Sequence, residues 1–152
     1  MAEAKKVPAE IATNRLFDAD ILLAEDNVVN QKLAIHMLRR LGCRVTLAQN
    51  GREAVELAEQ LRTPIIFMDC QMPEMDGFEA SRLIRSGLDY QPVIIALTAN
   101  SLPGDRERCI QAGMNDYLEK PFQRKELARL LDRYLPIVES SDIVESKIIP
   151  TK

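Results

Sequence analysis

Charged or hydroxyl-bearing side chains follow four short apolar runs of this sequence. The runs cover residues 21–24, 65–68, 93–97 and 117–118, and the side chains after them include Glu25 and Asp26, Asp69, Thr98, and Lys120. Uninterrupted apolar runs of this length are typical of strands that a parallel sheet buries on both faces. Open α/β sheets bind their ligands beyond the carboxyl ends of such strands. We therefore expect these polar side chains to meet at one edge of a sheet.

Three carboxylates gathered at one edge would repel each other and raise their own pKa values unless a cation lay among them. Carboxylate oxygens with room for water suit Mg²⁺. The ammonium group of Lys120 and the hydroxyl group of Thr98 are then left to hold an anion beside the metal ion. The sequence therefore predicts a site for Mg²⁺ and an anionic group, with Glu25, Asp26 and Asp69 as its acidic side.

Helical patterns separate the apolar runs. The first has an apolar stripe at helical spacing, formed by Leu33, Ala34, Met37, Leu38 and Leu41. A further strand is expected over 45–48, and 116–118 should form an edge strand. Strand and helix then alternate five times, which favours an open parallel sheet with helices on both faces and right-handed crossovers.

One of the expected helices, Asp105–Ala112, has few apolar side chains. Cys109 and Ile110 are its main anchors. A helix with so little to bury is loosely held, and loosely held elements are the ones that move in switches. We therefore expect this helix to take part in any conformational change.

The composition is that of a soluble globular domain. The chain has 152 residues, which fits one domain, expected over 19–136, between linkers or tails at 1–18 and 137–152. A net charge of −3 without a basic block argues against direct nucleic-acid binding. No apolar stretch reaches membrane-spanning length. Three scattered cysteines match neither a disulfide framework nor a zinc cluster, so we expect a reducing, cytoplasmic location.

Several separated motifs resemble the receiver domain of two-component response regulators. They are Glu25-Asp26, Asp69 within the segment 68–77, Thr98-Ala99 and Lys120-Pro121. The segment 24–31 further resembles the receivers attached to hybrid sensor histidine kinases. The resemblance covers roughly residues 20–135 and implies a flavodoxin-like, doubly wound fold. Its five parallel strands have the order 2-1-3-4-5 with five helices, which places Asp26 and Asp69 in neighbouring loops.

The resemblance also implies roles for the acidic residues. Asp69 would be the phosphoacceptor, its carboxylate attacking phosphorus to form an aspartyl phosphate. Asp26, Asp69 and the backbone carbonyl of Cys70 would bind Mg²⁺, and Glu25 would act through metal-bound water.

Three further residues receive roles from the same resemblance. Lys120 and Thr98 would contact oxygens of the phosphoryl group, and Lys120-Pro121 would be a cis peptide. If Thr98 moves toward the phosphoryl group, Tyr117 could rotate inward, so Thr98 and Tyr117 are the expected switch residues.

The implied function is a phosphoacceptor module in a two-component phosphorelay. Its donor would be a histidine kinase or a histidine phosphotransfer protein, and a downstream partner would bind the face formed by 105–112, 116–118 and 124–131. The domain would be stand-alone or part of a hybrid kinase, which could be tethered to a membrane. Such a module catalyses its own phosphorylation and dephosphorylation without being a conventional enzyme.

Two alternatives stay open at this point. One is a Mg²⁺-dependent phosphohydrolase that uses an aspartyl phosphate, although Gln71 occupies the position where such enzymes usually carry a second acid. The other is a scaffold receiver that binds partners without phosphorylation. Scaffold receivers usually lose an acid or the lysine, and this sequence keeps them all.

Overall fold

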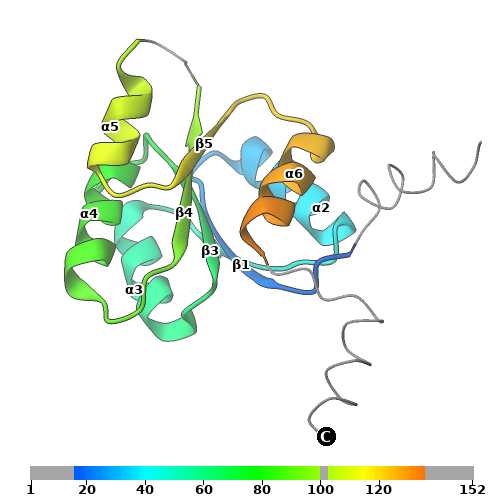
Figure 1. Cartoon of the computed structure of the whole chain (residues 1–152), viewed down its shortest axis with the longest axis horizontal. Helices are drawn as coiled ribbons and strands as arrows, with labels where there is room; N and C mark the ends of the chain where they lie inside the picture. The colour runs from blue at the N-terminus through cyan, green and yellow to red at the C-terminus, as the bar shows by residue number, and fades with distance from the viewer. Residues whose placement is uncertain (1–15, 100–102, 136–152) are drawn as a thin grey trace, which may run out of the picture.

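The computed structural model describes residues 16–99 and 103–135, so most of both predicted tails lies outside the described residues. Within these ranges strand and helix alternate five times, as the sequence predicts (Figure 1). The elements are β1 (Asp20–Ala24), α2 (Val28–Arg40), β2 (Arg44–Ala48), α3 (Gly51–Leu61), β3 (Ile65–Asp69), α4 (Gly77–Gly87), β4 (Val93–Thr98), α5 (Asp105–Gln111), β5 (Asp116–Glu119) and α6 (Arg124–Tyr134).

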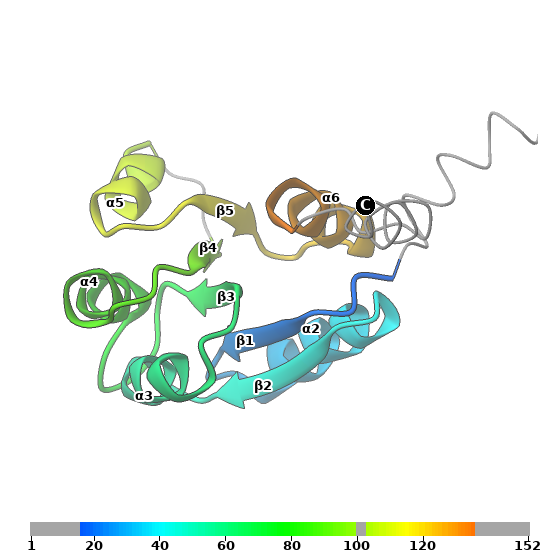
Figure 2. The same cartoon turned by 60° about the horizontal axis from the view of Figure 1, so that its bottom comes forward.

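The five strands form one parallel sheet in the order β2-β1-β3-β4-β5, which confirms the predicted topology. Figure 2 shows the sheet nearly edge-on, with α2 and α6 on one face and α3, α4 and α5 on the other. Because β1 and β3 are neighbours and parallel, their carboxyl ends lie side by side, and so do the loops that follow them.

The central strands are apolar because both of their faces are covered. Alternate residues of a strand point to opposite faces, and Leu23 and Phe67 accordingly join the core under α2 and α6. Leu22 and Met68 join the core under α3, α4 and α5. All four side chains are almost fully buried. The sheet is therefore anchored on both faces, which fixes where its polar strand ends lie.

The turn after β3 is closed by a glycine. The Gly77 N–H donates to the Cys70 carbonyl over 3.1 Å, and the Asp76 side chain caps α4 by accepting from the Glu79 N–H. A Cβ atom at Gly77 would collide with the Asp69 carbonyl oxygen and lie 2.9 Å from Met68 Cγ. The start of α4 thus packs directly against the last residues of β3.

Two expectations about helix faces are wrong. Leu33 of α2 is 54% exposed and Ile110 of α5 is 57% exposed, although both were placed among the anchors of their helices. The rest of the α2 stripe is buried or half-buried. In α5 only Cys109 is buried, so this helix has even less apolar anchoring than the sequence suggests.

Polar contacts hold the carboxyl end of α5. The Arg85 side chain, from α4, donates from Nε to the Gly113 carbonyl over 2.8 Å and from a terminal nitrogen to Asn115 Oδ1 over 2.7 Å. Asn115 Oδ1 also accepts from the Ile94 N–H at 2.8 Å. The turn between α5 and β5 is therefore tied to both α4 and β4.

The packed part of the chain begins earlier than the predicted boundary at residue 19. The Phe17 N–H donates to the Leu41 carbonyl over 2.8 Å, and its side chain packs in the core under α2 and α6. Among the described residues, no helix is both long enough and apolar enough to cross a membrane.

Candidate functional site

The carboxyl ends of β1, β3, β4 and β5 surround a cleft of about 330 Å³. The predicted residues that line it are Glu25, Asp26, Asp69, Cys70, Thr98 and Lys120. Tyr117 is not among the lining residues. It lies half-buried beside a separate groove between α5, β5 and α6. The structure therefore brings together every predicted site residue except the proposed switch tyrosine.

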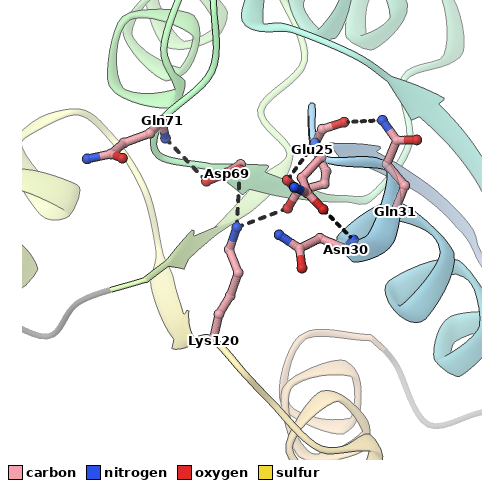
Figure 3. Close-up of polar contacts among 7 residues, drawn as sticks. Glu25, Asn30, Gln31, Asp69, Gln71 and Lys120 are labelled. Atoms are coloured by element: carbon pink, nitrogen blue, oxygen red, sulfur yellow. Dashed lines mark hydrogen bonds and ion pairs between the residues drawn. The ribbon is translucent and has the colours of Figure 1, made fainter.

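The acidic side of the cleft is compact. Carboxylate oxygens of Glu25, Asp26 and Asp69 lie within 4.8 Å of one another. Glu25 and Asp69 are 1% and 5% exposed, whereas Asp26 is exposed. Backbone N–H groups orient the two buried carboxylates. The Asn27 N–H donates to Glu25 Oε2 over 3.1 Å. The Gln71 N–H donates to Asp69 Oδ1 over 3.2 Å (Figure 3).

Lys120 forms ion pairs with both buried carboxylates. Its Nζ lies 3.0 Å from Glu25 Oε1 and 3.2 Å from Asp69 Oδ2 (Figure 3). The Lys120 N–H also donates to the Thr98 carbonyl over 2.7 Å, so the ends of β4 and β5 are linked beside the cleft. The Lys120-Pro121 peptide is cis, as predicted.

Burial and charge both act on the ionisation of these groups. The pKa of Asp69 is raised to about 6. Burial is the largest cause, the neighbouring Glu25 carboxylate also raises this pKa, and the Lys120 ammonium group lowers it. Burial alone would lower the pKa of Lys120, but the ion pairs with Asp69 and Glu25 outweigh it and raise this pKa. One ammonium group thus only partly neutralises three carboxylates, an all-oxygen donor set that fits a hard divalent cation such as Mg²⁺.

Gln31 braces the acidic side of the cleft, a role that the sequence did not predict. Its side-chain Nε2 donates to the Glu25 carbonyl over 2.7 Å in a buried contact (Figure 3). The Glu25 N–H donates to the Ala48 carbonyl, so both backbone groups of this residue are held. Asp26 follows directly, and its position therefore depends on this brace. Gln31 stands in the segment 24–31 that resembles hybrid-kinase receivers, which was the one available signal.

The α4 and α5 helices form the opposite wall, which the sequence motifs do not predict. Phe78, Asp105 and Arg108 line the cleft there. The Arg108 Cζ atom lies 4.2 Å from the centroid of the Phe78 ring. The spacing of Asp105 and Arg108 places them on one helix face, but spacing alone does not show that this face borders the cleft.

Comparison with known proteins identifies related sequences over most of the chain. The sequence profile of the response regulator receiver domain matches residues 21–132. Hybrid signal transduction histidine kinase B of Dictyostelium discoideum is 44% identical over an alignment of 128 residues, and the match covers 76% of this chain and 6% of that kinase. Signal transduction histidine-protein kinase BarA of Escherichia coli K12 is 40% identical over 76% of this chain and 13% of its own length. The chain spans only a small part of these relatives.

Solved structures agree with the sequence matches. The receiver domain of the sensor histidine kinase PA1611 from Pseudomonas aeruginosa PAO1 has a TM-score of 0.72 and 55% identity, covering 76% of this chain and 96% of that one. That structure has a magnesium ion coordinated in its active-site cleft. The receiver domain of Saccharomyces cerevisiae Ssk1, crystallised with the histidine phosphotransfer protein Ypd1, has a TM-score of 0.72 and 32% identity over 78% of this chain and 90% of that one.

Proposed function

This chain belongs to the response regulator receiver domain family of two-component signalling, and from that premise we propose that Asp69 accepts a phosphoryl group from a phosphohistidine protein. The observation that carries the proposal is the placement of Asp69. Its carboxylate is buried in a cleft, contacts Lys120 Nζ at 3.2 Å and lies beside two further carboxylates. A carboxylate held next to a cation and an oxygen-rich metal site is equipped to receive phosphorus.

The chain's own residues have separate tasks in this transfer. An Asp69 carboxylate oxygen forms a bond to phosphorus while the bond from phosphorus to the donor's histidine nitrogen breaks. Lys120 and Thr98, which border the same cleft, stabilise the charge on the phosphoryl oxygens as it redistributes. Because Lys120 is already held by Glu25, its ammonium group is positioned before the donor arrives.

We propose that Asp26 and Asp69 bind Mg²⁺ directly and that Glu25 acts through metal-bound water. When bound, the ion neutralises charge on the phosphoryl oxygens. The Cys70 carbonyl, which the resemblance suggested as the backbone ligand, accepts a hydrogen bond from the Gly77 N–H at 3.1 Å and is thus directed toward α4. We therefore assign the backbone ligand to the next carbonyl of the loop, that of Gln71, which also lines the cleft.

Incubation with acetyl phosphate tests the proposed reaction. In the presence of Mg²⁺ the protein should gain one phosphoryl group, visible by intact mass spectrometry, and EDTA should prevent the gain. Hydroxylamine should remove the group, because it cleaves acyl phosphates and spares phosphate esters of serine or threonine. A hydroxylamine-resistant label, or labelling at the same rate in EDTA, would refute the proposal. Repeated release of phosphate from a phosphate ester would instead favour the phosphohydrolase alternative.

We propose that the donor protein docks on the amino-terminal half of α2. A donor must bring its phosphohistidine above Asp69 and therefore must cover the rim of the cleft, to which Asp26 and Asn30 contribute. Beside that rim, Val28, Val29 and Leu33 are 57%, 64% and 54% exposed. Exposed apolar side chains grouped at a functional rim are typical of protein-binding surfaces.

A small apolar pocket supports this assignment. It has a volume of about 60 Å³ and is lined by Leu33, Met37, Pro121 and Phe122 among others. The pocket lies between α2 and the cis Lys120-Pro121 peptide, next to the phosphoryl-transfer site. A side chain of the donor that enters it would fix the donor's orientation over the cleft.

Leu33→Asp should slow phosphorylation by a protein donor but not by a small-molecule donor. Transfer from a phosphorylated histidine phosphotransfer protein should slow by about tenfold, because a charge would replace an apolar contact worth about 1–2 kcal/mol. Labelling by acetyl phosphate should stay at the wild-type rate. Leu61→Asp is the matched control, since Leu61 is 43% exposed on α3, on the other face of the sheet. Equal slowing in both variants would contradict the docking surface.

The output face remains the one that the sequence suggested, formed by α5, β5 and α6. Tyr117, Arg133 and Tyr134 line a groove of about 230 Å³ there. We propose that phosphorylation draws Thr98 toward the new oxygens and that Tyr117 then turns inward, which would reshape this groove for a downstream protein.

We also propose a cytoplasmic location and a domain over residues 19–136, against which Phe17 packs. The three cysteines, Cys43, Cys70 and Cys109, are all free thiols in the structure, which suits a reducing compartment.

A further inference from the structure

A second cation, Arg108 of α5, lines the cleft that contains Asp69 and Lys120. We infer that Arg108 is an anion-binding residue that draws the phosphodonor into the cleft, an inference that rests on the proposed phosphoacceptor function. Neither the sequence motifs nor the ligand set proposed above includes this residue.

Phe78 holds the guanidinium group in place. The Arg108 Cζ atom lies 4.2 Å from the ring centroid, within the range of a cation–π contact. Phe78 is itself 8% exposed and sits in the first turn of α4, the helix that packs against the end of β3. A cation–π contact does not itself use the N–H groups of a guanidinium group, which can still donate hydrogen bonds to an anion. We therefore infer that the aromatic contact positions Arg108 for this task.

The charges of the cleft give Arg108 a task that Lys120 does not perform. Four carboxylates line the cleft, those of Glu25, Asp26, Asp69 and Asp105. Lys120 is bound to two of them and its side chain is only 16% exposed, whereas Arg108 is exposed. Of these two cations, Arg108 is therefore the one whose charge is open to an anionic donor in solvent. Charges at the rim of a site act mainly on association and on its salt dependence.

The test compares Arg108→Gln with Arg108→Lys and with a matched control on α4. Arg82→Gln removes an identical charge, but Arg82 is exposed and is not among the residues that line the cleft. For each protein, the second-order rate constant of phosphorylation by acetyl phosphate is measured at saturating Mg²⁺ and at two salt concentrations. Mg²⁺ affinity is measured separately by calorimetry.

Arg108→Gln should lower the rate constant roughly three- to fivefold at low salt, as expected for one partly screened charge near the reaction. Added salt should slow the wild type more than this variant. Arg108→Lys should recover most of the rate, and Arg82→Gln should match the wild type. Mg²⁺ affinity of Arg108→Gln should stay constant or increase slightly, because a repelling positive charge has been removed.

In Arg108→Gln, anion binding predicts a lower phosphorylation rate without a loss of Mg²⁺ affinity. Structural damage to the site would lower both quantities. Mg²⁺ affinity that falls more than threefold in Arg108→Gln would show a distorted site and overturn the inference. An unchanged rate constant in Arg108→Gln, or an equal loss in Arg82→Gln, would overturn it as well. If the wild type gains no phosphoryl group from acetyl phosphate, the proposed phosphoacceptor function is wrong. This result differs from a failure of the Arg108 inference alone, in which the wild type is still phosphorylated.

Discussion

Asp69→Asn should take up no phosphoryl group from acetyl phosphate and should melt at a higher temperature than the wild type in Mg²⁺-free buffer. The amide has nearly the same shape as the carboxylate but is a far poorer nucleophile. Labelling should therefore fall to background, with the cleft intact. No other acid replaces Asp69 in our proposal, because Asp26 and Glu25 are assigned to the Mg²⁺ site.

The stability gain has an electrostatic cause. Asp69 is 5% exposed and lies among like charges, which together raise its pKa to about 6. Its ionised form therefore destabilises the fold at neutral pH. This penalty builds up as the pH rises from the ordinary carboxyl pKa of 3.8 to about 6, and it is constant at higher pH. Removing the charge should increase the free energy of unfolding by about 1 kcal/mol after allowance for the lost contact with Lys120. This corresponds to roughly 3 °C in melting temperature.

Asp89→Asn is the control for both measurements. Asp89 pairs with Arg62 at 2.6 Å, its side chain is 84% exposed, and this pair lowers its pKa. The variant should be labelled at the wild-type rate and should gain no stability. A hydroxylamine-sensitive label on Asp69→Asn would show that another residue is the phosphoacceptor. A lower melting temperature for Asp69→Asn would show that the carboxylate stabilises the metal-free fold.

Of the glycine-to-alanine substitutions near the site, Gly77→Ala should lower the stability of the fold most. Its Cβ atom would collide with the Asp69 carbonyl oxygen, and the backbone of a central strand cannot move aside easily. We expect a loss of about 3 kcal/mol or more in the free energy of unfolding, measured by urea denaturation. Protein that remains folded should also be phosphorylated slowly, because relief of the clash displaces Asp69.

Gly87→Ala provides the comparison within the same helix. Gly87 is the last residue of α4, and a Cβ atom there would meet nothing within 4 Å. Alanine should stabilise this position by up to about 1 kcal/mol, since it restricts the unfolded chain more than glycine does. If Gly77→Ala were as stable as Gly87→Ala, the close packing of α4 on β3 would be wrong.

The sequence was sufficient to predict that polar groups at the strand ends meet in the cleft. Parallel strands carry their following residues to one edge of the sheet, so Asp69, Thr98 and Lys120 were expected together once three buried runs were recognised. The neighbouring positions of β1 and β3, which bring Asp26 to Asp69, came from the family resemblance. Periodicity does not determine the order of strands.

The rotational setting of the helices was the part that the sequence could not supply. Leu33 and Ile110 lie within or beside apolar patterns, yet both are exposed, because a helix on a sheet buries only a narrow stripe. Gln31 and Arg108 gained their roles for the same reason. Whether a polar side chain on α2 or α5 reaches the cleft depends on how each helix is rotated over the sheet, and local spacing does not encode that angle.

The contacts of Arg85 with the turn after α5 have a mechanical consequence. They hold the carboxyl end of the helix at Gly113, whereas its amino end near Asp105 borders the cleft. A movement of α5 would therefore be a rotation about this anchored turn, with the largest displacement at the end beside the phosphoacceptor. Arg108 lies between the two ends of the helix, so the rotation would move its charge toward or away from the opening of the cleft.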